Sequence, residues 1–93
     1  MAVRSLNNHA DFESLFTYNF RPLCLYALHY LGNVEESEDI VQECYATLWE
    51  KLQQGAEVTN RRAYLYMTVR NQISKALKIL KEGAQKIISY FFA

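Results

Sequence analysis

Apolar residues recur along this chain at steps of three and four positions, the spacing that places them on one face of an α-helix. The first such run covers about residues 9–31 and contains Pro22, which lacks an amide hydrogen and clashes with the preceding helical turn. We therefore expect two short helices or one bent helix here. Gly32 and Asn33 should end it, because glycine suits the left-handed conformation that follows many helices.

Two further helices are predicted from the same spacing. One should begin near Asn33 or Ser37, either of which can cap a helix, and run to about Gln54. Four acidic residues in its first turns suit the positive end of a helix: Glu35, Glu36, Glu38 and Asp39. The other should follow the loop of residues 54–59, with Asn60 as its cap, and its pattern is interrupted at Gly83.

Turn-forming residues are scarce, with three glycines and one proline in 93 residues, so strands are not expected. The prediction is an all-α fold, a compact three- to four-helix bundle. Residues 1–82 should form the helical domain. Residues 83–93 form an apolar tail without an assigned role, which either packs back on the bundle or pairs two chains.

The net charge is zero, but the two halves of the chain differ. Residues 1–53 carry three basic and eight acidic residues, a net charge of −5, whereas residues 54–93 carry seven and two, a net charge of +5. One interpretation is a basic face for a polyanion together with an acidic face for a basic partner. The other is that the halves neutralise each other within the fold. Charge alone leaves both open.

Neither an enzyme nor a metal site is indicated. His9 and His29 have no paired nucleophile motif, and the chain has no glycine-rich phosphate loop, so no cofactor is expected. Cys24 and Cys44 lie within apolar helical patterns, which favours two buried free thiols over a disulfide, and their spacing does not suggest zinc. The chain lacks a signal-peptide pattern and a membrane-spanning run, so we expect a cytoplasmic protein without membrane insertion.

One candidate binding face lies on the second predicted helix. Asp39, Gln42 and Glu43 stand at positions i, i+3 and i+4 and therefore share one exposed side, which can bind a basic partner helix. Taken alone, a solvated helix face explains these residues more simply.

A second candidate lies on the third predicted helix, where Arg62, Tyr66 and Arg70 follow the spacing i, i+4, i+8. Arginines bind phosphates and tyrosine rings stack on unpaired bases, a combination suited to single-stranded nucleic acid. The alternative is a charged surface with its tyrosines half packed into the core.

Together these segments carry a specific resemblance. The stretches SEDIVQECYATLWEK, residues 37–51, and NRRAYLYMTVRN, residues 60–71, resemble region two of bacterial sigma factors of the extracytoplasmic-function (ECF) type. Phe12-Glu-Ser-Leu-Phe, Arg21-Pro-Leu and Tyr30-Leu-Gly are similar to the first helices of that domain. The resemblance covers about residues 11–71. Such factors continue into a helix-turn-helix domain, region 4, which is not expected in this chain.

The resemblance implies that the chain docks on a coiled coil of the largest subunit of core RNA polymerase and binds the melted −10 promoter strand. The polymerase-binding residues would be Asp39, Gln42, Glu43, Tyr45 and Trp49. The loop of residues 54–60 and the start of the third helix would bind the strand. The DNA-binding residues would be Asn60, Arg61, Arg62, Tyr64, Tyr66, Arg70 and Asn71. The alternative is a protein-interaction module that binds an anti-sigma factor, or a second copy through the tail, without productive DNA binding.

Overall fold

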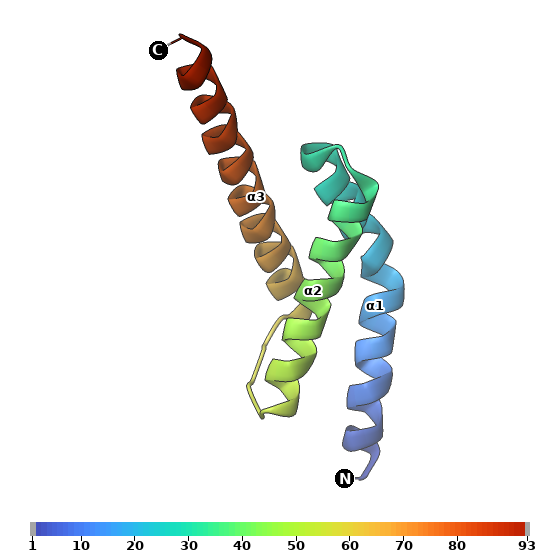
Figure 1. Cartoon of the computed structure of the whole chain (residues 1–93). Helices are drawn as coiled ribbons and strands as arrows, with labels where there is room; N and C mark the ends of the chain where they lie inside the picture. Colours follow the sequence, from blue (N-terminus) through green and yellow to red (C-terminus); the bar gives the residue numbers. More distant parts are fainter. Residues whose placement is uncertain (1, 93) are drawn as a thin grey trace.

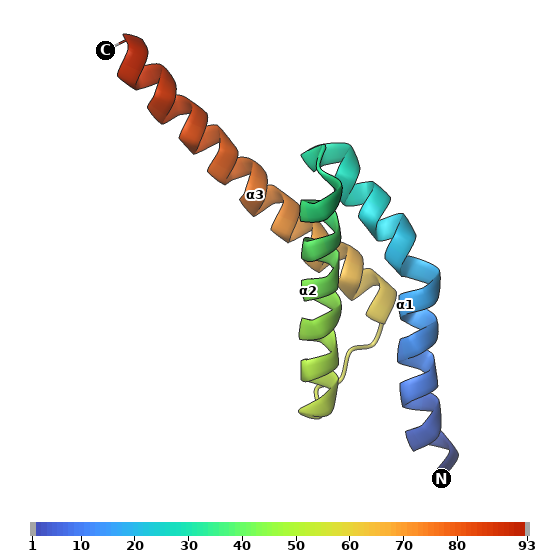
Figure 2. The same cartoon turned by 45° about the vertical axis from the view of Figure 1, so that its right-hand side comes forward.

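The computed structural model describes the backbone of residues 2–92 and the side chains of residues 11–91. Three helices make up this part of the chain: α1 (Ala2–Leu31), α2 (Val34–Gln53) and α3 (Arg61–Phe92). α1 and α2 run antiparallel, and α3 crosses them and projects beyond the turn that joins them (Figures 1 and 2). The described residues contain no strand, so the all-α prediction is confirmed.

α1 is one bent helix and not two short ones. It continues through Pro22 and changes direction along its length, as Figure 2 shows. Proline leaves the carbonyl four residues earlier without its usual amide donor, which is a common cause of such bends. About two turns before Pro22, the Leu15 carbonyl accepts hydrogen bonds from the Asn19 side chain and from the Tyr45 hydroxyl, both at 3.0 Å.

Asparagine side chains begin both later helices. Asn33 Oδ1 accepts a hydrogen bond from the Glu36 amide at 2.9 Å, which decides between the two predicted caps of α2. Ser37 is buried inside the helix, where its hydroxyl donates to the Asn33 carbonyl at 2.7 Å. Asn60 caps α3 as predicted, accepting from the Ala63 amide at 2.9 Å.

The core lies where the three helices meet. Each helix contributes buried side chains, which are Leu23, Ala27, Val41, Cys44, Tyr45, Leu48, Leu65, Val69 and Ile73. Both cysteines are free, as expected, although Cys24 is only half-buried. Burial raises the pKa of both thiols, so the two cysteines are neutral packing residues at neutral pH.

The last part of α3 leaves the bundle. The helix runs through Gly83 without a break, and every side chain from position 77 to 91 is exposed. Figures 1 and 2 show this segment extending away from α1 and α2, so the described part of the tail does not pack back on the bundle. None of the helices in the described residues combines the length and apolarity that a membrane span requires.

Tyr45 makes stability sensitive to alkaline pH. Burial raises the pKa of its phenol well above the ordinary value of 10.0, whereas the unfolded chain keeps the ordinary value. Above about pH 10 the unfolded state therefore loses a proton that the folded state retains. The stability that depends on the neutral phenol is complete below this pH and is lost as pH rises toward the folded-state pKa.

We predict that Tyr45→Phe is less stable than the parent by about 1 kcal/mol at neutral pH, because the Leu15 carbonyl loses a donor. Between about pH 9 and 11 the variant should lose less stability than the parent. Urea denaturation followed by circular dichroism measures both effects, and the other ionisable groups are common to the two proteins. Equal losses over this pH range would contradict the prediction.

Candidate functional site

The exposed side of α2 is acidic. Four acidic residues follow one another at steps of three, four and seven positions and therefore lie on one stripe of the helix. They are Glu36, Asp39, Glu43 and Glu50, and Gln42 lies beside them. All five side chains are exposed. The opposite side of α2 is buried against α1 and α3. These five residues, called the acidic face below, therefore point away from the bundle.

Tyr45 does not belong to this face. Only 3% of it is exposed, and its ring lies among Phe12, Phe16 and Phe20 of α1, with ring centroids between 4.9 and 6.2 Å away. Because its hydroxyl also donates to α1, the side chain supports α2 from within and offers no surface to a partner.

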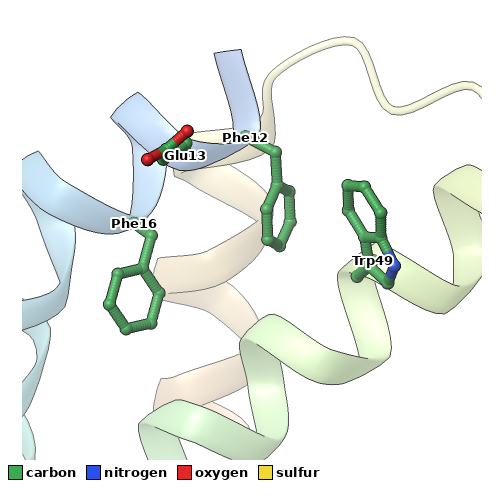
Figure 3. Close-up of a pocket in the computed structure, with 4 residues that line it drawn as sticks. All are labelled: Phe12, Glu13, Phe16 and Trp49. Carbon is green, nitrogen blue, oxygen red and sulfur yellow. The ribbon is translucent and has the colours of Figure 1, made fainter. Parts of the chain in front are cut away.

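Trp49 lies at the edge of α2, half-buried against α1. Its ring centroid is 4.8 Å from that of Phe12. Together with Glu13 and Phe16, these two rings line an open pocket of about 360 Å³ (Figure 3). This pocket, called the aromatic pocket below, was not predicted from the sequence. Helical spacing showed an apolar face on α1 but not which rings would remain accessible.

The loop and the start of α3 form a second surface with two hollows. One, of about 460 Å³, is lined by residues of α2, the loop and α3, including Lys51, Val58 and Tyr64. The other, of about 300 Å³, is lined by Asn60, Arg62, Ala63 and Tyr66. Asn60 and Ala63 line both hollows. The cap and first turn of α3 thus form the ridge between them.

Each hollow has a cation beside a tyrosine ring. The Arg62 guanidinium lies 5.4 Å from the centre of the Tyr66 ring, and the Lys51 ammonium lies 5.5 Å from that of Tyr64. Both tyrosines are half-buried, as the alternative interpretation of this segment expected. Tyr66 also approaches Tyr26 of α1, with ring centroids 6.0 Å apart. The rings are held in place and still partly accessible.

The other predicted DNA-binding residues are placed differently. Arg70 is exposed two turns beyond Arg62 on a neighbouring line of the helix, and Arg61 is half-buried. Asn71 follows Arg62 by nine residues, which is about two and a half turns, so it lies on the side of α3 opposite Arg62. The structure brings Asn71 into neither hollow. Lys51 was not predicted, because nothing in the sequence indicates that the end of α2 faces Tyr64.

The family model Sigma-70 region 2 matches residues 15–81, nearly three quarters of the chain. The chain therefore belongs to the sigma-70 region 2 family, and the resemblance at this level is confirmed. The match contains the acidic face and both hollows. Comparisons with curated proteins and with solved structures gave no match. Family membership indicates a non-enzymatic role in RNA polymerase binding and promoter melting.

Proposed function

We propose that this chain is the region 2 module of an ECF-type sigma factor. It docks on the largest-subunit coiled coil of core RNA polymerase through the acidic face and binds the melted −10 strand at the start of α3. The observation that carries this proposal is the family match, which spans two chemically opposite surfaces on separate helices. Such a module would act in the cytoplasm, where bacterial RNA polymerase works.

The acidic face suits a basic helical partner. Asp39, Gln42 and Glu43 are exposed side chains on a helix whose opposite side is fixed in the core, so they are presented in a constant arrangement. Carboxylates and an amide accept hydrogen bonds from arginine and lysine. A cluster of like charges also steers an oppositely charged partner toward this side of the domain.

The start of α3 suits an unpaired strand. Its two hollows lie on either side of one ridge, and each combines a tyrosine ring with a cation. Bases that have left the duplex can stack on aromatic rings, while arginine and lysine neutralise the phosphates between them. The amide end of a helix also favours negative charge. These features support single-strand binding over binding of a closed duplex.

Glu43→Lys should abolish binding to core RNA polymerase, because it places a positive charge in the middle of the acidic face. The measurement is a pull-down of core enzyme with the parent and variant chains. Glu82→Lys, the same charge change on an exposed position of α3, is the matched control and should bind normally. Binding by a well-folded Glu43→Lys chain would refute docking through this face.

Arg62→Ala should weaken binding to single-stranded DNA and reduce its salt dependence. If Arg61, Arg62 and Arg70 each neutralise one phosphate, the plot of log affinity against log salt has a slope of about −2, and the variant loses about 0.7 of it. Fluorescence anisotropy with a short labelled strand measures this slope. Lys78→Ala, on the projecting part of α3, should leave it unchanged. An unaltered slope for Arg62→Ala would remove that residue from the interface.

One observation favours the second candidate, an interaction module. The projecting part of α3 carries a stripe of exposed apolar side chains at alternating steps of three and four residues. They are Leu77, Leu80, Ala84, Ile87 and Phe91. They continue the stripe that Leu65, Val69 and Ile73 bury in the core. This alternation is the spacing of a helix-pairing seam, so a second copy can cover it.

Under this second candidate the parent chain dimerises at high concentration, and Leu80→Glu makes it monomeric. Analytical ultracentrifugation over a range of concentrations tests this. Gln85→Glu introduces the same residue on the polar side of the helix and should leave the dimer intact. A parent chain that stays monomeric throughout would exclude pairing through this stripe.

A further inference from the structure

The aromatic pocket is held in shape by the core beneath it. Phe16 stacks on Phe20 with ring centroids 4.7 Å apart and meets the buried Tyr45 ring at 4.9 Å. Phe12 contacts Tyr45 on one side and Trp49 on the other. Because each of these rings packs against another, the pocket does not have to be assembled when a ligand arrives. Figure 3 shows Phe12, Phe16 and Trp49 around the opening, with Glu13 on the same stretch of α1.

The pocket borders the acidic face. Trp49 immediately precedes Glu50 in α2. It lies about one helical turn beyond Ala46 and two turns beyond Gln42, and both of these residues are exposed. Ala46 and Gln42, which lie between the acidic side chains and Trp49, are short or uncharged. A partner helix that lies along the acidic face can therefore reach the pocket with one long side chain.

The lining selects the chemistry of that side chain. Three aromatic rings provide faces and edges for a flat group, and the Glu13 carboxylate provides a negative charge beside them. A guanidinium is planar, stacks on aromatic rings and pairs with carboxylates in a fixed geometry, whereas an ammonium is a compact and strongly hydrated charge. An aliphatic side chain would fill the space but leave the carboxylate without a role.

We propose that the aromatic pocket receives an arginine side chain of the protein that docks on the acidic face. The inference rests on the proposed docking of core RNA polymerase and adds a site to it. The arginine stacks against Trp49 and Phe12 and pairs with Glu13. Docking then has a charged part, made by the acidic face, and a stacking part, made by the pocket.

The first test uses the free chain and three short peptides that are capped at both ends and differ only in a central arginine, citrulline or lysine. Citrulline has nearly the shape of arginine without its charge. Trp49 is the single tryptophan, so its indole N–H gives one NMR signal that reports on the pocket. We expect the arginine peptide to shift this signal with saturation, and the citrulline and lysine peptides to bind at least about fivefold more weakly.

Glu13→Gln should weaken the arginine peptide about fivefold and leave the citrulline peptide unchanged, since only the charge is removed. Glu82→Gln is the matched control, remote from the pocket, and should change neither. Equal binding of the arginine and citrulline peptides would overturn the proposal, as would an arginine peptide that fails to shift the indole signal.

The second test measures affinity for core RNA polymerase. Glu13→Gln should bind about fivefold more weakly than the parent, while Glu82→Gln binds equally well. Normal binding by Glu13→Gln, together with loss of binding by Glu43→Lys, would overturn the pocket proposal and leave the proposed function standing. Normal binding by both variants would refute both. Circular dichroism and the urea midpoint establish that each variant is folded.

Discussion

The packing of Tyr45 against α1 is the interaction on which the rest of the structure depends. Its ring fills the space among three phenylalanines of α1. Its hydroxyl donates a hydrogen bond to the carbonyl of Leu15, which is thirty residues earlier in the sequence. A buried hydroxyl without a partner would cost free energy, so this hydrogen bond fixes how α2 is rotated against α1. That rotation turns the acidic face outward and places Trp49 beside Phe12.

The separation of charge along the sequence becomes a separation in space. The acidic face is opposite the side of α2 that packs on α1 and α3, so its carboxylates point away from the basic residues at the start of α3. Direct pairing between Asp39 or Glu43 and those arginines is therefore not how the two halves balance. Although the net charge is zero, the molecule therefore has a negatively charged surface on α2 and a positively charged surface at the start of α3.

Local signals in the sequence predicted local features of the fold well. Asn33, Asn60 and Pro22 each act on the backbone within one turn, and the two caps and the bend of α1 follow from them. The interruption of the helical pattern expected at Gly83 does not occur, because a local signal of this size can be outweighed by its neighbours. A glycine inside a helix costs only about 1 kcal/mol, and the good helix formers around it, such as Lys81 and Ala84, carry α3 through.

Features that depend on packing between helices were not predictable in the same way. Helical spacing puts Tyr45 within the apolar side of α2, between the lines of Leu52 and Trp49. The spacing does not show which rings of α1 surround Tyr45, or that its hydroxyl reaches the Leu15 carbonyl. The contact between Lys51 and the Tyr64 ring likewise depends on the path of the loop between α2 and α3, and helical periodicity does not predict that path. The position of Asn71 opposite Arg62, by contrast, follows from helix geometry alone once α3 is continuous.

Lys51 connects the two surfaces physically. It directly follows Glu50 of the acidic face, yet its ammonium lies over Tyr64 and lines the larger hollow. α2 is a regular helix packed on one side, so a partner bound along its acidic face holds the position of its last turn as well. The loop that follows is pinned at its far end by the Asn60 cap. Under the proposed function, a partner docked on the acidic face would hold the last turn of α2, and with it Lys51, in place before a strand enters the larger hollow. The strand would then lose less conformational entropy on binding, because part of the ordering has already occurred.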